Sequence, residues 1–215
     1  MADNIVILCA AGMLVTAYLM VGQKSLSTTI RLYAAQSLLL AIVGATKAIG
    51  DHHPRLFVMA AMTMVLKGIA IPSFLMRVVD RIGIRREIEP FLNVPTSLLA
   101  CLGLTVMGYR VSTGFAEAIV GVTHHVVGVG LSTMMIGLFM MVTRKKAITQ
   151  ILALLTFENA IFLVALGITA GMPLGVELGI FFDVLLAVLV LGVLVRRIVD
   201  RFESMDVSRL SKLKG

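Results

Sequence analysis

The sequence predicts an all-α integral membrane protein with seven transmembrane helices. Of its 215 residues, 59% are hydrophobic and 14% are charged, whereas about a quarter of the residues of a soluble domain carry charge. Seven apolar windows are each long enough, at about twenty residues, to cross a hydrocarbon layer of roughly 30 Å. Lys and Arg, which give the net charge of +7, fall in short clusters between these windows. Basic clusters between apolar windows set the orientation of a chain in the membrane and do not indicate nucleic-acid binding.

Each window is expected to be a helix, because lipid offers no water to satisfy free backbone groups. We predict a single membrane domain over residues 1–202 and a cytoplasmic tail over 203–215. The chain has an acid near its N-terminus and no basic leader region, so we expect the first helix to be retained. The predicted spans, in order, are 4–22, 29–50, 55–77, 91–109, 115–142, 147–169 and 174–195.

The first four spans differ in how many polar residues they carry. The first and fourth are predicted from length and hydropathy alone. In the second, Gln36 and Lys47 are eleven positions apart, close to three turns, so they share one side of the helix. The third has Lys67 at its centre, and Pro72 removes a backbone donor shortly after it. We therefore expect the third helix to bend next to Lys67.

The last three spans carry the remaining polar residues that lie far from the helix ends. His124 and His125 are about ten residues into the fifth span. Glu158 is about eleven residues into the sixth, which places it roughly 17 Å deep, and Asn159 follows it. Asp183 reaches a similar depth in the seventh span from the opposite side.

The distribution of basic residues predicts the orientation. Alternate connections are rich in Lys and Arg, and those between them carry almost none. The positive-inside rule then places the N-terminus outside and the C-terminus in the cytoplasm. The basic residues of the cytoplasmic connections include Lys24, Arg31, Arg81, Arg85, Arg86, Arg144, Lys145, Lys146, Arg196, Arg197 and Arg201.

Ionisable residues in the middle of spans are the strongest functional signal. A charge at a helix centre costs about 2.5–3.5 kcal/mol on insertion scales, and residues retained there usually face the bundle and mark an ion or proton path. Similar depth on separate helices predicts a lateral line of titratable groups that passes protons. The same residues could instead only fix helix packing, and both interpretations stay open. The candidates are Glu158, Asp183, Lys67, His124 and His125, with Gln36, Lys47 and Asn159 as secondary polar residues.

Five segments of the chain resemble hydrogenase-4 component E, a membrane subunit of group 4 nickel–iron hydrogenase complexes related to formate hydrogenlyase. They are YAAQSL (33–38), VLKGIAIP (65–72), FEN (157–159), ELGIFFDVLLAV (177–188) and MDVSRLSKLKG (205–215). The last three spans, 115–202, also resemble subunit K of respiratory complex I. In that resemblance Glu158 and Asp183 match two buried acids, although the K-type subunit has Glu at the second position.

The resemblance implies a non-catalytic subunit that takes part in proton translocation coupled to electron transfer. It implies no cofactor in this chain, with nickel–iron and iron–sulfur centres in partner subunits. Antiporter-like membrane subunits and a hydrogenase membrane anchor are the expected partners, in a bacterial or archaeal cytoplasmic membrane. A structural scaffold and a subunit of a multi-subunit Na⁺/H⁺ antiporter remain alternatives. Haem ligation is not indicated, because His124 and His125 are adjacent on one helix and cannot face each other across an iron.

Overall fold

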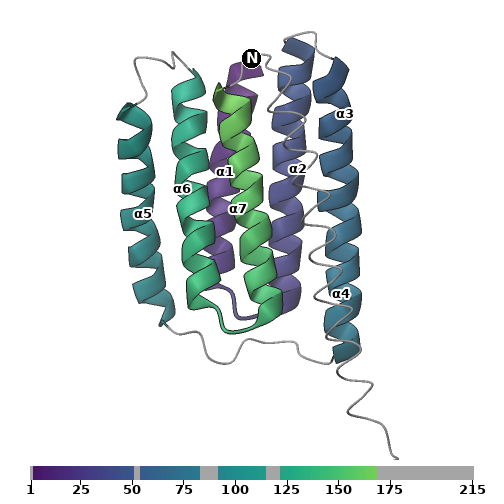
Figure 1. Ribbon diagram of the computed structural model, residues 1–215, viewed down its shortest axis with the longest axis vertical. Helices are drawn as coiled ribbons and strands as arrows, with labels where there is room; N and C mark the ends of the chain where they lie inside the picture. The colour runs from purple at the N-terminus through teal and green to yellow at the C-terminus, as the bar shows by residue number, and fades with distance from the viewer. Residues whose placement is uncertain (1, 51–53, 83–91, 115–121, 169–215) are drawn as a thin grey trace, which may run out of the picture. The chain divides into compact units, whose positions relative to one another are not determined.

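The computed structural model describes residues 2–50, 54–82, 92–114 and 122–168, and these residues are helical apart from short connections (Figure 1). They lie within one compact unit, residues 1–180, and the second unit, 181–215, falls outside the described residues. No strand occurs in the described ranges. The elements are α1 (Ala2–Gly22), α2 (Leu26–Gly50), α3 (Pro54–Met62), η1 (Thr63–Ala70), α4 (Ile71–Ile82), α5 (Val94–Gly114), α6 (Val122–Thr143) and α7 (Ala147–Ile168).

Six helical segments in the described residues are long and apolar enough to cross a membrane. They coincide with the first six predicted spans and confirm that these are helices. The fifth is described only from residue 122, because 115–121 lie outside the described residues. The seventh predicted span, 174–195, also lies outside them, so the seventh helix and the orientation stay predictions.

The third span combines three elements in one continuous helical stretch. Its central part, η1, is a π-helix, and at its end the Ile71 backbone N–H donates to the Leu66 carbonyl five residues earlier. A bend was expected beside Lys67, and the structure shows a change of helical register there. Pro72 has no N–H to continue the ladder, and the helix nevertheless runs on to Ile82. Segments of π-helix are rare and frequently occur at functional sites.

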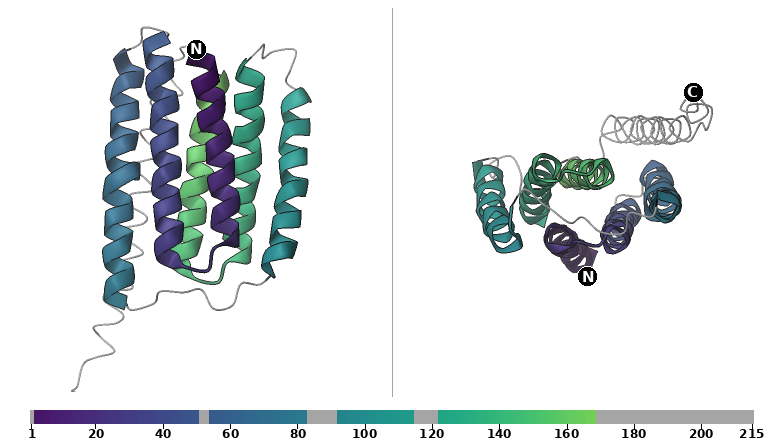
Figure 2. Two further views of the ribbon diagram at one scale, coloured as in Figure 1. Left: turned by 180° about the vertical axis from the view of Figure 1, so that it is seen from behind. Right: turned by 90° about the horizontal axis from the view of Figure 1, so that it is seen from below.

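Consecutive helices pack against each other up to α4 and again from α5 onward, and further pairings bring distant segments together. Hairpins join α1 to α2 and α6 to α7, while α1 also packs on α6 and α2 on α7 (Figures 1 and 2). An apolar cluster with members on α1, α2, α6 and α7 fills the space between them. Its buried members are Val6, Cys9, Ala10, Met13, Leu40, Val43, Ala48, Val126, Val129, Phe162, Leu163 and Leu166.

Glycines on α6 allow its close approach to α7. A Cβ added at Gly137 would lie 3.0 Å from the Cα of Phe157, and one at Gly130 would lie 2.5 Å from the Val164 side chain. Small residues commonly allow this kind of contact between membrane helices. The outward surfaces are apolar instead of charged, as a hydrocarbon environment requires. Exposed examples are Leu8, Ile49, Val58, Leu99, Val142 and Ile168.

Candidate functional site

A buried ion pair joins two membrane-length helices. Lys67 Nζ of η1 lies 3.1 Å from Glu158 Oε1 of α7, and the two side chains are 2% and 7% exposed. Both residues are near the middle of their helices, since Lys67 is in the span Ala60–Asp80 and Glu158 is in the 22-residue helix α7. Two charges removed from water in this way depend on each other, and loss of one partner typically costs about 3–5 kcal/mol. The structure thus brings together two of the predicted site residues.

An aromatic ring is a second neighbour of the lysine on α7. Lys67 Nζ lies 5.9 Å from the centroid of the Phe162 ring, which is buried. Phe162 follows Glu158 by one helical turn, so both face the lysine from α7. Sequence reasoning missed Phe162, because an aromatic residue in an apolar helix is usually a core residue. Its spacing of four from the acid was the available signal.

Amide side chains form a second buried connection beside the ion pair. Asn159 Nδ2 donates to Gln36 Oε1 at 3.4 Å and to Ser37 Oγ at 3.0 Å, and Gln36 Nε2 donates to the Met13 carbonyl at 3.1 Å. All these side chains are buried. The Met13 carbonyl can only accept, so it sets the orientation of the Gln36 amide and, through it, that of Asn159. This amide bridge of Asn159, Gln36 and Ser37 ties α7 to α2 and α1.

Ser37 was not among the predicted site residues. A serine in an apolar span is commonly a small packing residue. Its position directly after Gln36 could have indicated a polar partner, but only the pairing of α2 with α7 brings it to Asn159.

The two histidines lie away from the ion pair. His124 Nε2 is 3.5 Å from Ser112 Oγ of α5, while His125 is exposed. The contacts of Gly130 with Val164 and of Gly137 with Phe157 place residue 136 level with Glu158. His124 is twelve residues from that level, about 18 Å along the helix axis. The expected depth was counted from the start of a 28-residue window, whereas the packing of α6 on α7 gives the level of Glu158 directly.

Two further predicted residues complete the comparison. Lys47 is half-buried in the last turn of α2, where a cation is favoured by the helix dipole. Asp183 lies outside the described residues. The parts that His124, His125, Lys47 and Asp183 take in proton movement stay predictions.

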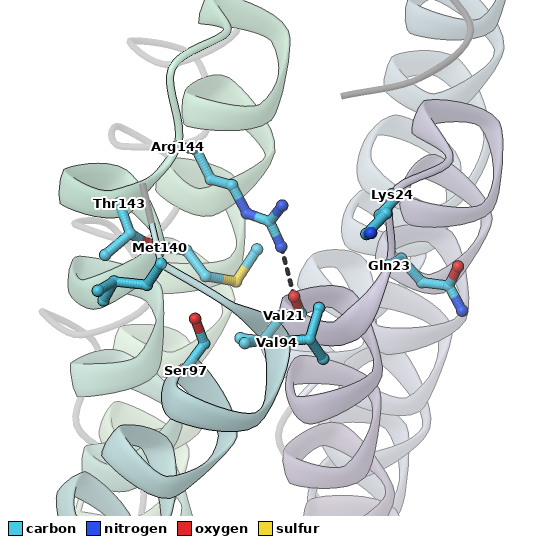
Figure 3. Close-up of a pocket in the computed structure, with 9 residues that line it drawn as sticks. Val21, Gln23, Lys24, Val94, Ser97, Met140, Thr143 and Arg144 are labelled. Carbon is cyan, nitrogen blue, oxygen red and sulfur yellow. Dashed lines mark hydrogen bonds between the residues drawn. The ribbon is translucent and has the colours of Figure 1, made fainter. Parts of the chain in front are cut away.

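The sequence places Arg144 in a basic cluster, but the structure shows that its side chain is buried and contacts α1. It follows α6 directly, is only 6% exposed, and donates from Nη2 to the carbonyls of Met20 at 3.2 Å and Val21 at 2.5 Å. Figure 3 shows the bond to Val21. These carbonyls belong to the last turn of α1, where no backbone N–H of the helix is left to donate to them. Arg144 therefore caps α1 from the connection between α6 and α7. It also lines a small pocket with Lys24 and Ser97.

The described helices offer little for metal binding. Within residues 2–50, 54–82, 92–114 and 122–168, no three His, Cys, Asp or Glu side chains gather closely enough to hold a metal ion. Cys9 and Cys101 are buried free thiols on α1 and α5.

A bundle of membrane-length helices with a lysine–glutamate pair in its interior defines a multi-pass membrane protein that carries ionisable groups within the bilayer. The chain is 33% identical over 206 residues to the uncharacterized protein Rv0085 of Mycobacterium tuberculosis (strain ATCC 25618 / H37Rv), a match that covers 95% of this chain and 94% of that protein. It belongs to the same family as Rv0085.

A more distant relation is to hydrogenase-4 component E. The chain is 27% identical over 212 residues to the proteins of that name from Escherichia coli K12 and Shigella flexneri, and the match covers 94% of each chain. The resemblance inferred from five segments is thus supported as a family-level relation. No family model matches the chain, and no solved structure matches it.

Proposed function

We propose that this chain is a membrane subunit of a hydrogenase-4-type complex and that its Lys67–Glu158 pair takes part in proton translocation coupled to electron transfer. One observation carries the proposal: opposite charges 3.1 Å apart, buried midway along two separate membrane-length helices. Ionisable residues retained at such depth usually belong to ion or proton paths. The relation to hydrogenase-4 component E supports the kind of complex.

The ion pair couples the protonation of Glu158 to the charge around Lys67. Two unit charges 3.1 Å apart attract each other by roughly 5 kcal/mol at an effective dielectric constant of about 20. Protonation of Glu158 removes this attraction, and a change in the charge near Lys67 alters the ease of that protonation. Moving one charge across 100 mV involves about 2.3 kcal/mol. The coupling within the pair is therefore large enough to matter for translocation.

The amide bridge has a different part in this proposal. Amide side chains donate and accept hydrogen bonds but do not titrate in water. We assign them the task of holding α7 against α2 and α1, while Glu158 and Asp183 exchange protons and the Lys67 ammonium pairs with Glu158. Hydrogenase catalysis belongs to partner subunits that hold the nickel–iron and iron–sulfur centres. Antiporter-like subunits and a membrane anchor are the proposed neighbours in a bacterial or archaeal cytoplasmic membrane.

The test uses the whole complex in inverted membrane vesicles. With Glu158→Gln, we expect viologen-driven hydrogenase activity per assembled complex to be retained, while proton uptake per assembled complex during oxidation of the physiological donor falls at least about tenfold, the effect of 1.4 kcal/mol. Arg31→Met, which removes an exposed cation from α2, is the matched control and should leave proton uptake unchanged. If the Glu158→Gln complex assembles and translocates protons normally, the proposed role of the acid is wrong.

A scaffold function is the second candidate, because the ion pair and the amide bridge both tie α7 to other helices. It predicts that assembly and translocation decline together in Lys67→Met and Glu158→Gln. The double change Lys67→Met with Glu158→Met removes both charges, so it should restore assembly. Under the scaffold function translocation returns with assembly, and under the proposed function it does not. Identification of the subunits that co-purify in mild detergent distinguishes a hydrogenase complex from an antiporter.

A further inference from the structure

The ammonium of Lys67 has two attractive neighbours on one face of α7. Nζ lies 3.1 Å from the Glu158 carboxyl and 5.9 Å from the Phe162 ring centroid. A lysine within about 6 Å of a ring centroid is attracted to the negative face of the ring, more strongly when the site is desolvated. Here the lysine and the ring are both buried. One neighbour titrates, and the other does not.

This difference matters when a proton reaches Glu158. The carboxyl then becomes neutral, and the attraction between opposite charges is lost. The attraction of the ring is unaffected, because the ring has no proton to gain. Protonation of Glu158 therefore weakens the hold of α7 on the ammonium. The ring opposes this loss, since it attracts the ammonium whether or not the carboxyl is charged.

We propose that Phe162 is a positioning residue that holds the Lys67 ammonium in place while Glu158 is protonated. This inference rests on the proposed function and deepens it. The proton on the Glu158 carboxyl is the one being translocated, and it leaves again from that carboxyl. Lys67 keeps its three protons throughout. The pair thus alternates between ammonium with carboxylate and ammonium with carboxylic acid.

The experiment replaces Phe162 with 4-fluoro-, 3,5-difluoro- and 3,4,5-trifluorophenylalanine in the complete complex. Fluorine withdraws electron density from the ring face while the ring keeps its shape, so cation attraction weakens and packing does not. We expect proton translocation to fall stepwise with fluorination and to reach roughly a tenth of its normal rate in the trifluoro variant. The amount of assembled complex should stay the same.

Phe157 supplies the matched control on the same helix. It packs against Gly137 of α6, and no cation lies over its ring in the described part of the chain. The same fluorinated series at Phe157 should leave translocation unchanged. A flat series at Phe162, a decline equal to that at Phe157, or a loss of assembly in parallel with translocation would overturn the inference.

Failure of this inference can be told apart from failure of the proposed function. If Glu158→Gln stops translocation while the Phe162 series is flat, only the role of the ring is wrong. If Glu158→Gln leaves translocation intact, the pair does not serve translocation and the ring has no such role either.

Discussion

Lys67 and Glu158 are stable in the bundle interior because each depends on the other. Their side chains are almost fully removed from solvent, and an isolated charge in such a place is far more costly than a matched pair. The π-helical turn and the middle of α7 bring the two groups within direct contact. The pair is accordingly the point at which small changes should have the largest effect on stability.

Single substitutions at the pair should destabilise more than the double substitution. We expect Lys67→Met to lower stability by about 3–5 kcal/mol, since the Glu158 carboxylate loses its lysine in a desolvated site. Lys67→Met combined with Glu158→Met should be within about 1 kcal/mol of the parent or more stable. Thermal unfolding midpoints in mild detergent measure this. Effects that simply add would show that the two groups are not coupled.

Asn159 is predicted to matter for stability independently of the ion pair. Asn159→Leu removes two donated hydrogen bonds and leaves Gln36 Oε1 buried without that donor, which costs about 1–3 kcal/mol. Thr113→Val is the control, because the exposed Thr113 hydroxyl bonds only to a carbonyl of its own helix. The same thermal unfolding measurement should show a clear decrease for the first variant and none for the second. Equal midpoints would mean that the amide bridge contributes nothing.

The contact between α5 and α6 is set by a glycine. A Cβ added at Gly108 would lie 2.7 Å from the backbone Cα of Ser132, whereas one added at Gly103 on the same helix meets nothing within 4 Å. Ser132 also donates to the Thr105 carbonyl across this contact. The two helices are therefore as close as their backbones allow.

Alanine at these two glycines should act in opposite directions. Gly108→Ala forces α5 away from α6, and we expect a loss of about 1–3 kcal/mol. Gly103→Ala should be neutral or stabilising by about 0.4–1 kcal/mol, because alanine restricts the unfolded chain without a clash. Thermal unfolding in detergent again provides the comparison. A gain of similar size in both variants would indicate that helix propensity, and not the close contact, decides the outcome.

Arg144 links elements that are distant in the chain. Its guanidinium caps α1 from the connection between α6 and α7, and the Gln150 side chain donates to its carbonyl. Arg144→Gln should destabilise the bundle by about 1.5–3 kcal/mol, the range for hydrogen bonds that involve a charged group. Lys145→Gln, an exposed neighbour in the same basic cluster, should have a much smaller effect. Equal effects would show that net charge is responsible and not the cap.

The arrangement of the chain across the membrane gives a prediction of its own. The basic connections place the N-terminus outside, so position 51 should face outward and position 145 should face the cytoplasm. In a background with Cys9 and Cys101 replaced by Ala, we expect a membrane-impermeant maleimide to label Asp51→Cys in intact cells. Lys145→Cys should be labelled only after permeabilisation. The reverse pattern would invert the orientation.

The sequence alone determined that the chain is a helical membrane protein, where its first six spans lie, and that Lys67, Glu158, Gln36 and Asn159 are unusual. Hydropathy and length are local properties, so they can be evaluated from any window of the chain. Only the tertiary structure decided which polar residues meet. It paired Lys67 with Glu158, joined Asn159 to Gln36 and Ser37, and placed His124 near Ser112. Such contacts depend on helix rotation and pairing, which residue spacing within one helix does not specify.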